Sequence, residues 1–230
     1  MPESLHSNSE TPDWQAQLEP VYRTYAALAG AMDPNFGLGG KLLYAGELHE
    51  EGAQLMRAAN IAGAASLAAT ADPEALRRAN REGVADFLVT SLDEALRVLK
   101  NEVRKRQAVS VAVSDSPAQV VAEMLERGVQ PDLLPPTAWS GDSRSLDLFP
   151  ATSQRLEIGP LPEDLTFRAW AAAPPEFEAL ASAILLQDDH ANRRWLRLSP
   201  RYVGPAARRV RSFGCSAETA ERLNAILAPR

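Results

Sequence analysis

The stretch that decides the fold is YAGELHEEGAQLMRAANIAGAASL, residues 44–67. It runs from an apolar segment typical of a strand, through one glycine, into a helical pattern and then into a second apolar segment. A dinucleotide-binding fold places its phosphate loop at such a strand-to-helix junction, with the pattern G-x-G-x-x-G. Counted from Gly46, those three positions hold Gly46, Leu48 and Glu51. The junction predicts the fold, whereas its residues depart from the phosphate-binding pattern.

The alternation of apolar segments and helical patterns continues from this stretch to residue 134. Asp72 and Pro73 begin one helix, which ends at Gly83, and Ser91 with Glu94 forms a capping box at the start of another. The predicted strands are 41–45, 64–70, 86–90, 108–113 and a short segment within 131–135. Because the links are short, we expect an α/β fold with a Rossmann-like parallel sheet, right-handed crossovers and flanking helices.

The remaining chain predicts an N-terminal helical segment, the Rossmann-like domain, a proline-rich connection and a helical C-terminal section, at residues 1–38, 39–136, 137–164 and 165–230. The first helix is expected to break or restart near Pro20, because proline removes a helical hydrogen bond. A short strand is predicted at 146–149. Three helical patterns fill the last section, at 177–187, 190–198 and 216–227.

Charge and composition restrict the partners. The net charge is −6, yet nine arginines against two glutamates give residues 191–230 a charge of +7, so the first 190 residues carry −13. We expect the basic segment 193–211 to contact an acidic surface of its own chain or of a second copy, and we expect no nucleic-acid partner. One cysteine, Cys215, and the absence of a long apolar run predict a soluble cytoplasmic protein without a membrane partner.

Residues 39–134 resemble the central NAD-binding domain of urocanase (urocanate hydratase), chiefly in YAGELHEEGAQ, SLDEAL and RGVQPDLL. The resemblance implies a homodimer and NAD as cofactor, in an enzyme that adds water to urocanate during histidine breakdown. The family loop reads G-x-G-G-M-G-G-A-Q, and residues 46–54 occupy it. The family's cofactor-binding positions therefore correspond to Gly46, Gly52, Ala53 and Gln54, with Thr70 at the ribose end.

The departures from this loop predict that NAD binding has been lost. Leu48 is expected to obstruct the approach of a pyrophosphate, and Glu50 and Glu51 bring two negative charges to a helix N-terminus. At ~4 Å each charge would repel a phosphate by about 1 kcal/mol in water and about 4 kcal/mol near a protein surface. The helix dipole offers only about 0.3–1 kcal/mol in return. Thr70 stands where the family has a ribose-binding acid, so three contacts change together.

Other chemically active residues favour plain structural roles. Glu50 and Glu51 are expected to close their own helix N-terminus rather than join His49 around a metal ion. Cys215 precedes a helix, where a dipole can activate a thiol, yet no histidine lies near it in sequence, so we expect an inert residue. The segment 187–190 (QDDH) could supply acid and base groups but is expected to be a solvated helix end.

We therefore expect a non-catalytic urocanase relative that serves as a binding or interaction module, forms a homodimer and needs no cofactor. The alternative is an NAD-dependent, urocanate hydratase-like lyase that has acquired other phosphate contacts. A third possibility is a Rossmann-type pocket adapted to a neutral or cationic small molecule. Fold alone does not decide among these functions.

Overall fold

The computed structural model describes residues 13–139, 143–171, 173–204 and 209–228. Its main feature is a six-stranded sheet in the order β3-β4-β2-β1-β5-β6, in which every neighbouring pair is parallel. The chain alternates between strands and helices, as the sequence predicts. The elements are β1 (Leu42–Glu47), α2 (Glu50–Ala62), β2 (Ala65–Ala69), α3 (Pro73–Arg81), β3 (Phe87–Val89), α4 (Leu92–Lys105), β4 (Val109–Val113), α5 (Pro117–Glu126) and β5 (Leu133–Leu134).

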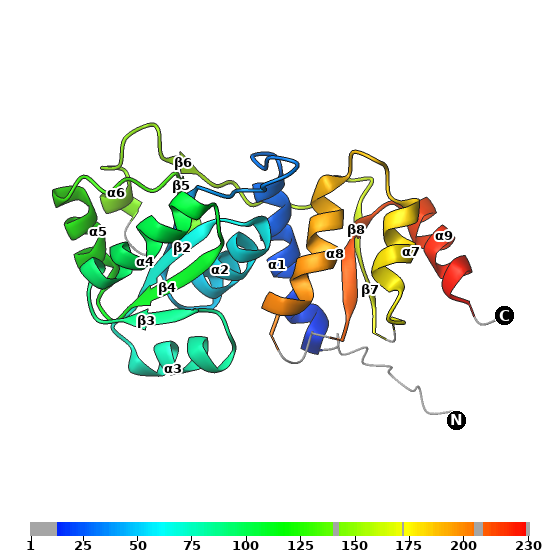
Figure 1. Ribbon diagram of the computed structural model, residues 1–230, viewed down its shortest axis with the longest axis horizontal. Coiled ribbons are helices and arrows are strands. Elements are labelled where there is room, and N and C mark those ends of the chain that lie inside the picture. The colour runs from blue at the N-terminus through cyan, green and yellow to red at the C-terminus, as the bar shows by residue number, and fades with distance from the viewer. Residues whose placement is uncertain (1–12, 140–142, 172, 205–208, 229–230) are drawn as a thin grey trace, which may run out of the picture.

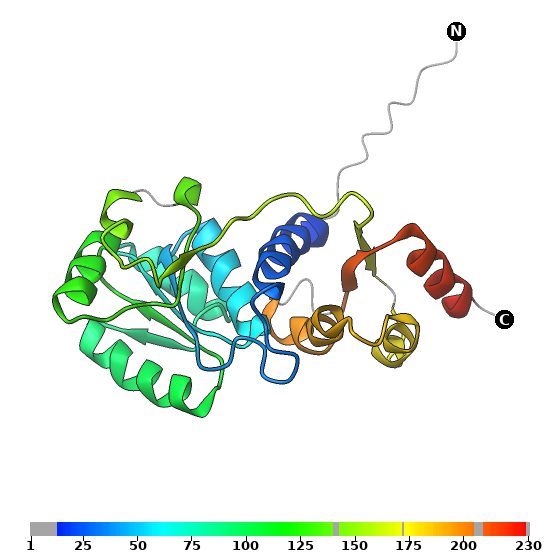
Figure 2. The ribbon, with the colours of Figure 1, turned by 90° about the horizontal axis from the view of Figure 1, so that it is seen from above.

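Helices cover both faces of this sheet (Figure 2). Side chains of α2 and α3 pack on one face together with Leu43 of β1, while α4 and α5 pack on the other with Val111 of β4. The central strands β2 and β4 are buried along their whole length, which explains why their sequences are apolar runs without alternation. The α/β Rossmann-like fold expected from the sequence is confirmed.

Local sequence signals fix the helix ends. The side chain of Asp72 accepts a hydrogen bond from the Glu74 amide and caps α3, and Ser91 caps α4 in the same way through the Glu94 amide. The Glu94 carboxylate accepts from the Thr90 amide at 2.9 Å, and this contact lowers the pKa of Glu94. Both predicted helix starts are therefore confirmed.

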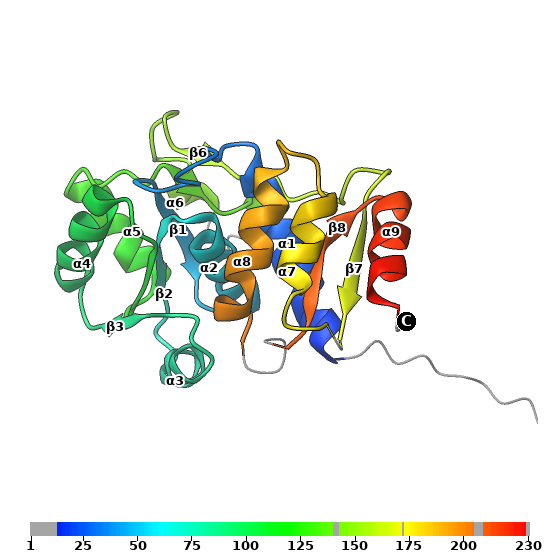
Figure 3. The same cartoon turned by 45° about the vertical axis from the view of Figure 1, so that its right-hand side comes forward.

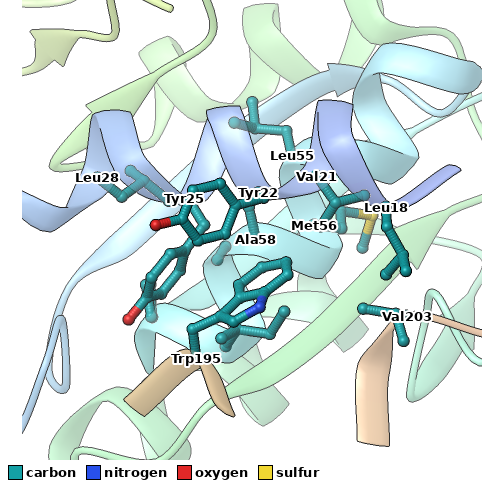
Figure 4. Close-up of a cluster of buried hydrophobic side chains, with 14 of the residues drawn as sticks. Leu18, Val21, Tyr22, Tyr25, Leu28, Leu55, Met56, Ala58, Trp195 and Val203 are labelled. Atoms are coloured by element: carbon teal, nitrogen blue, oxygen red, sulfur yellow. The ribbon is translucent and has the colours of Figure 1, made fainter. Parts of the chain in front are cut away.

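The first helix differs from its prediction. α1 (Asp13–Ala29) runs without a break through Pro20, because one face of the helix is packed against α2 and α8 (His190–Tyr202) (Figure 4). Figure 4 shows Tyr22 and Tyr25 of α1 around Trp195 of α8, and the rings of Tyr22 and Trp195 meet edge to face at 4.9 Å. Burial of this aromatic cluster offsets the hydrogen bond that proline removes, about 3 kcal/mol in a helix interior.

The proline-rich connection also differs from expectation. The strand predicted at 146–149 is wrong: a short helix, α6 (Ser143–Leu146), precedes a turn, and Leu146 and Phe149 are buried against the α4 and α5 side of the sheet. A two-residue strand that was not predicted, β6 (Gln154–Arg155), extends the sheet beyond β5. A single turn of 3-10 helix, η1 (Thr137–Trp139), lies between β5 and α6.

The C-terminal section contains the predicted helices together with two strands that the sequence analysis missed. The helices are α7 (Phe177–Ile184), α8 and α9 (Ala217–Leu227), and an antiparallel pair, β7 (Thr166–Trp170) and β8 (Arg211–Cys215), lies among them (Figure 3). Figure 1 shows α1 between the parallel sheet and this section. Among the helices that the structure describes, none is long and apolar enough to span a membrane.

Candidate functional site

The carboxyl ends of β1 and β5 form the point where an open parallel sheet normally binds its ligand. These strands are neighbours, and the chain leaves them toward opposite faces, into α2 on one face and toward α6 on the other. Such a switch in direction creates a crevice outside the strand ends. The loop 46–52 lies at this crevice, so the family loop and the expected binding position coincide.

The first family glycine, Gly46, is required by the backbone itself. The pairing of β1 with β2 shifts register between Tyr44 and Gly46, which marks a β-bulge, and Gly46 has a φ of 78°. A residue with a side chain is strained in this left-handed region, whereas glycine is not. The glycine at this position therefore follows from the shape of the strand end, with or without a ligand.

The second surviving glycine, Gly52, is required by packing. A Cβ atom added to Gly52 would lie 2.0 Å from the carbonyl oxygen of Glu47, because the first turn of α2 presses against the end of β1. No real side chain tolerates that distance. Gly46 and Gly52 therefore both have structural reasons to be retained that do not involve a nucleotide.

The side chain of Leu48 does not obstruct the crevice, and this part of the prediction is wrong. Leu48 is 2% exposed and lies in the same core cluster as Ala45 and Leu55, beneath α2. Its backbone, however, matters for ligand binding. The Leu48 amide donates to the carbonyl of Ala69 at 2.8 Å, so this loop amide is already used within the sheet.

The N-terminus of α2 is closed by its own loop. His49 is the capping residue, and its Nδ1 accepts from the Gly52 amide at 3.5 Å. The same Nδ1 lies 3.2 Å from a carboxylate oxygen of Glu51, and Glu50 and Glu51 occupy the first turn. Because one ring nitrogen accepts when unprotonated and donates when protonated, the cap and the ion pair exclude each other. The first turn therefore carries its own negative charge at the position of a phosphate.

The other family positions also make internal contacts. Ala53 packs against the core beneath α2, and Gln54 follows it in the helix, partly buried. Thr70, which stands in place of the ribose-binding acid, is 1% exposed at the end of β2. Its Oγ1 accepts from the Asp72 amide at 3.1 Å. Thr70 thus stabilises the turn that leads into α3.

A cavity of about 350 Å³ lies at the end of β1, between β1, α5 and α6. Tyr44, Pro117 and Leu146 supply apolar lining, and Gly46 and Glu47 supply the rim from the loop. The Tyr44 hydroxyl donates to the Pro117 carbonyl at 3.4 Å. Burial, with the nearby Glu47 carboxylate as a second cause, raises the pKa of Tyr44, so this hydroxyl stays neutral. A small ligand would therefore meet a mainly apolar site with an acid at its edge.

The remaining candidates from the sequence have structural roles. Cys215 is 3% exposed, and burial raises the pKa of its thiol to about 11, which opposes formation of the reactive thiolate. Within the segment 187–190, Gln187, Asp188 and His190 are exposed, as expected, whereas the Asp189 carboxylate caps α8 through the Asn192 amide at 3.0 Å. In the part of the chain that the structure describes, no group of three or more metal-binding side chains occurs around His49 or elsewhere.

Two arginines of the basic segment attach α8 to its own chain. Nε of Arg194 donates to the carbonyl of Ile61 at 2.7 Å, at the C-terminal end of α2, where the helix dipole favours a cation. Arg193 donates to the carbonyls of Leu185 and Leu186, after α7. These contacts lie within the chain, which is one of the two expected alternatives, but the acceptors are backbone carbonyls rather than an acidic surface.

A second cavity, of about 570 Å³, lies between α1 and the C-terminal section. Tyr22 and Tyr25 line it from α1, and Asn192 and Ser216 line it from the starts of α8 and α9. The Tyr22 hydroxyl donates to Asn192 at 2.7 Å. Sequence reasoning missed this cavity, since it depends on how α1 packs against residues more than 130 positions away.

Comparison with known proteins identifies the domain that contains the loop 46–52. Residues 18–138 match the model of the urocanase Rossmann-like domain, a region that includes most of α1, the parallel sheet through β5 and the loop 46–52. No curated protein matches the chain. The family match spans more than half of the 230 residues, and the observed fold agrees with it. The chain belongs to the urocanase family.

Proposed function

We propose that this urocanase-family chain is a non-catalytic binding or interaction module that does not hold NAD. The observation that carries the proposal is which glycines remain in the loop. Gly46 and Gly52 are the two that the backbone and the packing require, and the glycines between them, which the family loop needs for close approach of a phosphate, are replaced. This pattern is expected when a fold is kept after its cofactor is lost.

The residues present do not fit the cofactor that the family implies. Phosphate binding at a helix start uses backbone amides that point at the ligand. Here the Leu48 amide bonds to Ala69, and the Gly52 amide faces His49. Glu50 and Glu51 add negative charge at the same turn, and the side chain of Thr70 bonds to the following loop. Pyrophosphate and ribose would each have to displace an internal contact.

We also propose that the protein is cytoplasmic and self-associates. A single buried cysteine gives the chain no internal disulfide, which suits a reducing compartment. The uneven charge, +7 at the C-terminal end against −13 before it, favours contact between copies. The structure adds a candidate surface: β3 is an outer strand of the sheet, and Phe87 and Leu88 on it are 47% and 42% exposed.

Mass spectrometry of the purified, denatured protein tests the proposal, because a tightly held NAD would be released and counted. We expect far less than one NAD per chain. An open-loop variant, His49→Gly with Glu50→Gln and Glu51→Gly, removes the cap and both negative charges from the start of α2. It should raise NAD occupancy or affinity while leaving Leu48 in the core. Glu74→Gln is the matched control, since it neutralises an acid in the first turn of α3 instead.

The alternative function is an NAD-dependent, urocanate hydratase-like lyase. Family membership and a cavity beside the loop favour it. Stoichiometric NAD in the unmodified protein would promote this alternative and overturn the non-catalytic proposal.

A further inference from the structure

We propose that the cavity between the end of β1, α5 and α6 takes a compact organic cation or uncharged hydrogen-bond donor with an apolar body, and that Glu47 selects the donor group. The inference rests on the proposed function, since it assumes that NAD does not fill this edge of the sheet. It assigns the ligand class from the residues that line the cavity.

Size is the first argument. The cavity measures about 350 Å³, at the small end of the range of about 300–1,000 Å³ that ligand sites cover. A molecule with one ring and a short polar group fits this volume, whereas a dinucleotide carries two nucleosides and a pyrophosphate. The rings and methyl groups of Tyr44, Pro117, Val121 and Leu146 would contact the apolar body.

Charge is the second argument. Among the described lining residues, Glu47 is the acidic side chain and His49 the basic one, and neither arginine nor lysine is among them. The His49 ring carries no charge while it caps α2, and a protonated ring would pair with the Glu51 carboxylate 3.2 Å away. Glu47 is half-buried at the rim. A carboxylate partly removed from water favours a cation or a strong donor and repels an anion.

Hydrogen bonding is the third argument. Two helix starts face the cavity, and each is capped internally, α2 by His49 and α5 by Ser116, whose Oγ accepts from the Gln119 amide at 3.3 Å. The Tyr44 hydroxyl donates its hydrogen bond to the Pro117 carbonyl, so the lone pairs of the Tyr44 oxygen can still accept one. Glu47 and the Tyr44 oxygen therefore offer acceptors at this cavity, and a donor group on the ligand would complement them.

The test uses three probes of one size and shape that differ in charge: benzamidine, benzamide and benzoate. Each is titrated into the full chain by calorimetry, and the site is mapped by amide chemical-shift changes. We expect benzamidine to bind at least tenfold more tightly than benzoate, with benzamide between them, and the shifts to centre on the starts of α2 and α5. Equal or tighter binding of benzoate would overturn the charge argument.

Two pairs of variants locate the interaction. Glu47→Gln should remove the preference for benzamidine, whereas Glu50→Gln, an exposed acid three residues away, should keep it. Ala118→Trp should fill the cavity and weaken all three probes, whereas Ala122→Trp, exposed one turn further along α5, should not. Equal effects within a pair would contradict the assignment, as would shifts centred on the cavity beside Tyr22 and Tyr25.

The outcome is separable from that of the proposed function. Failure of all three probes to bind, in a protein that also does not bind NAD, would overturn only the ligand class. Micromolar binding of NAD would overturn the proposed function, whatever the probes do.

Discussion

The backbone amide of Leu48 donates a hydrogen bond to the carbonyl of Ala69 at 2.8 Å, which extends the pairing of β1 with β2 by one residue. This contact directs the Leu48 side chain into the core. It also makes the Leu48 amide unavailable to a ligand at the end of β1. Together with the His49 cap, it makes the loop 46–52 a self-contained turn. Such a turn holds its helix in place without a phosphate.

Gly52→Ala should destabilise the protein strongly, because the new methyl group would lie 2.0 Å from the Glu47 carbonyl oxygen. Overpacking of this kind costs typically about 1–3 kcal/mol and sometimes more, and backbone atoms cannot rotate away. Urea unfolding measures the loss of unfolding free energy. Gly30→Ala is the control, because nothing lies within 4 Å of its Cβ position. A neutral effect at Gly52 would show that packing does not explain this glycine.

Cys215 should resist alkylation in the folded protein. Burial raises the pKa of its thiol to about 11, so little thiolate forms between pH 7 and 8. The folded chain holds this thiol in its neutral form, so its pKa lies above the unfolded value near 9. Its contribution to the free energy of unfolding is therefore complete below pH 9 and is lost as the pH rises toward 11. Reaction with Ellman's reagent should be slow in buffer and fast in urea. Rapid stoichiometric labelling of the folded chain would contradict this expectation.

Self-association should depend on the outer edge of the parallel sheet. If two copies pair through β3, Leu88→Lys will weaken the dimer, because Leu88 is 42% exposed on that strand. Ile226→Lys, which alters an exposed apolar residue of α9, should leave the dimer intact. Sedimentation velocity at tens of micromolar, at low and moderate salt, follows both variants. A monomeric unmodified chain would remove the basis for the proposed homodimer.

Much of the fold could be predicted from local signals. Asp72, Pro73 and Ser91 mark helix starts by side-chain chemistry that acts within three residues, and the apolar runs of β2 and β4 follow from burial on both faces. The strand β6 was missed because it has only two residues, and β7 and β8 were missed because Arg168 and Arg211 interrupt their apolar pattern. Thr166 and Arg168 alternate with the buried Phe167, a signal of period two that was present and overlooked.

The candidate site was harder to predict, since it depends on where each side chain and backbone amide of the loop points. The sequence located the loop and its lost glycines, but it did not show that Leu48 turns inward or that His49 caps α2. Both follow from the bulge at Gly46, where the strand leaves its regular pairing. The cavity at this edge is lined by residues that lie as far apart in the sequence as Tyr44 and Leu146. No local sequence pattern predicts that they come together.

The measurement that tests the central claim most directly is calorimetric titration of the unmodified chain with NAD. The closed loop predicts no binding below about 1 mM, which corresponds to less than about 4 kcal/mol of binding free energy. The open-loop variant, His49→Gly with Glu50→Gln and Glu51→Gly, should bind NAD more tightly than the unmodified chain. Micromolar affinity in the unmodified chain, mapped to the start of α2, would contradict the loss of the cofactor site.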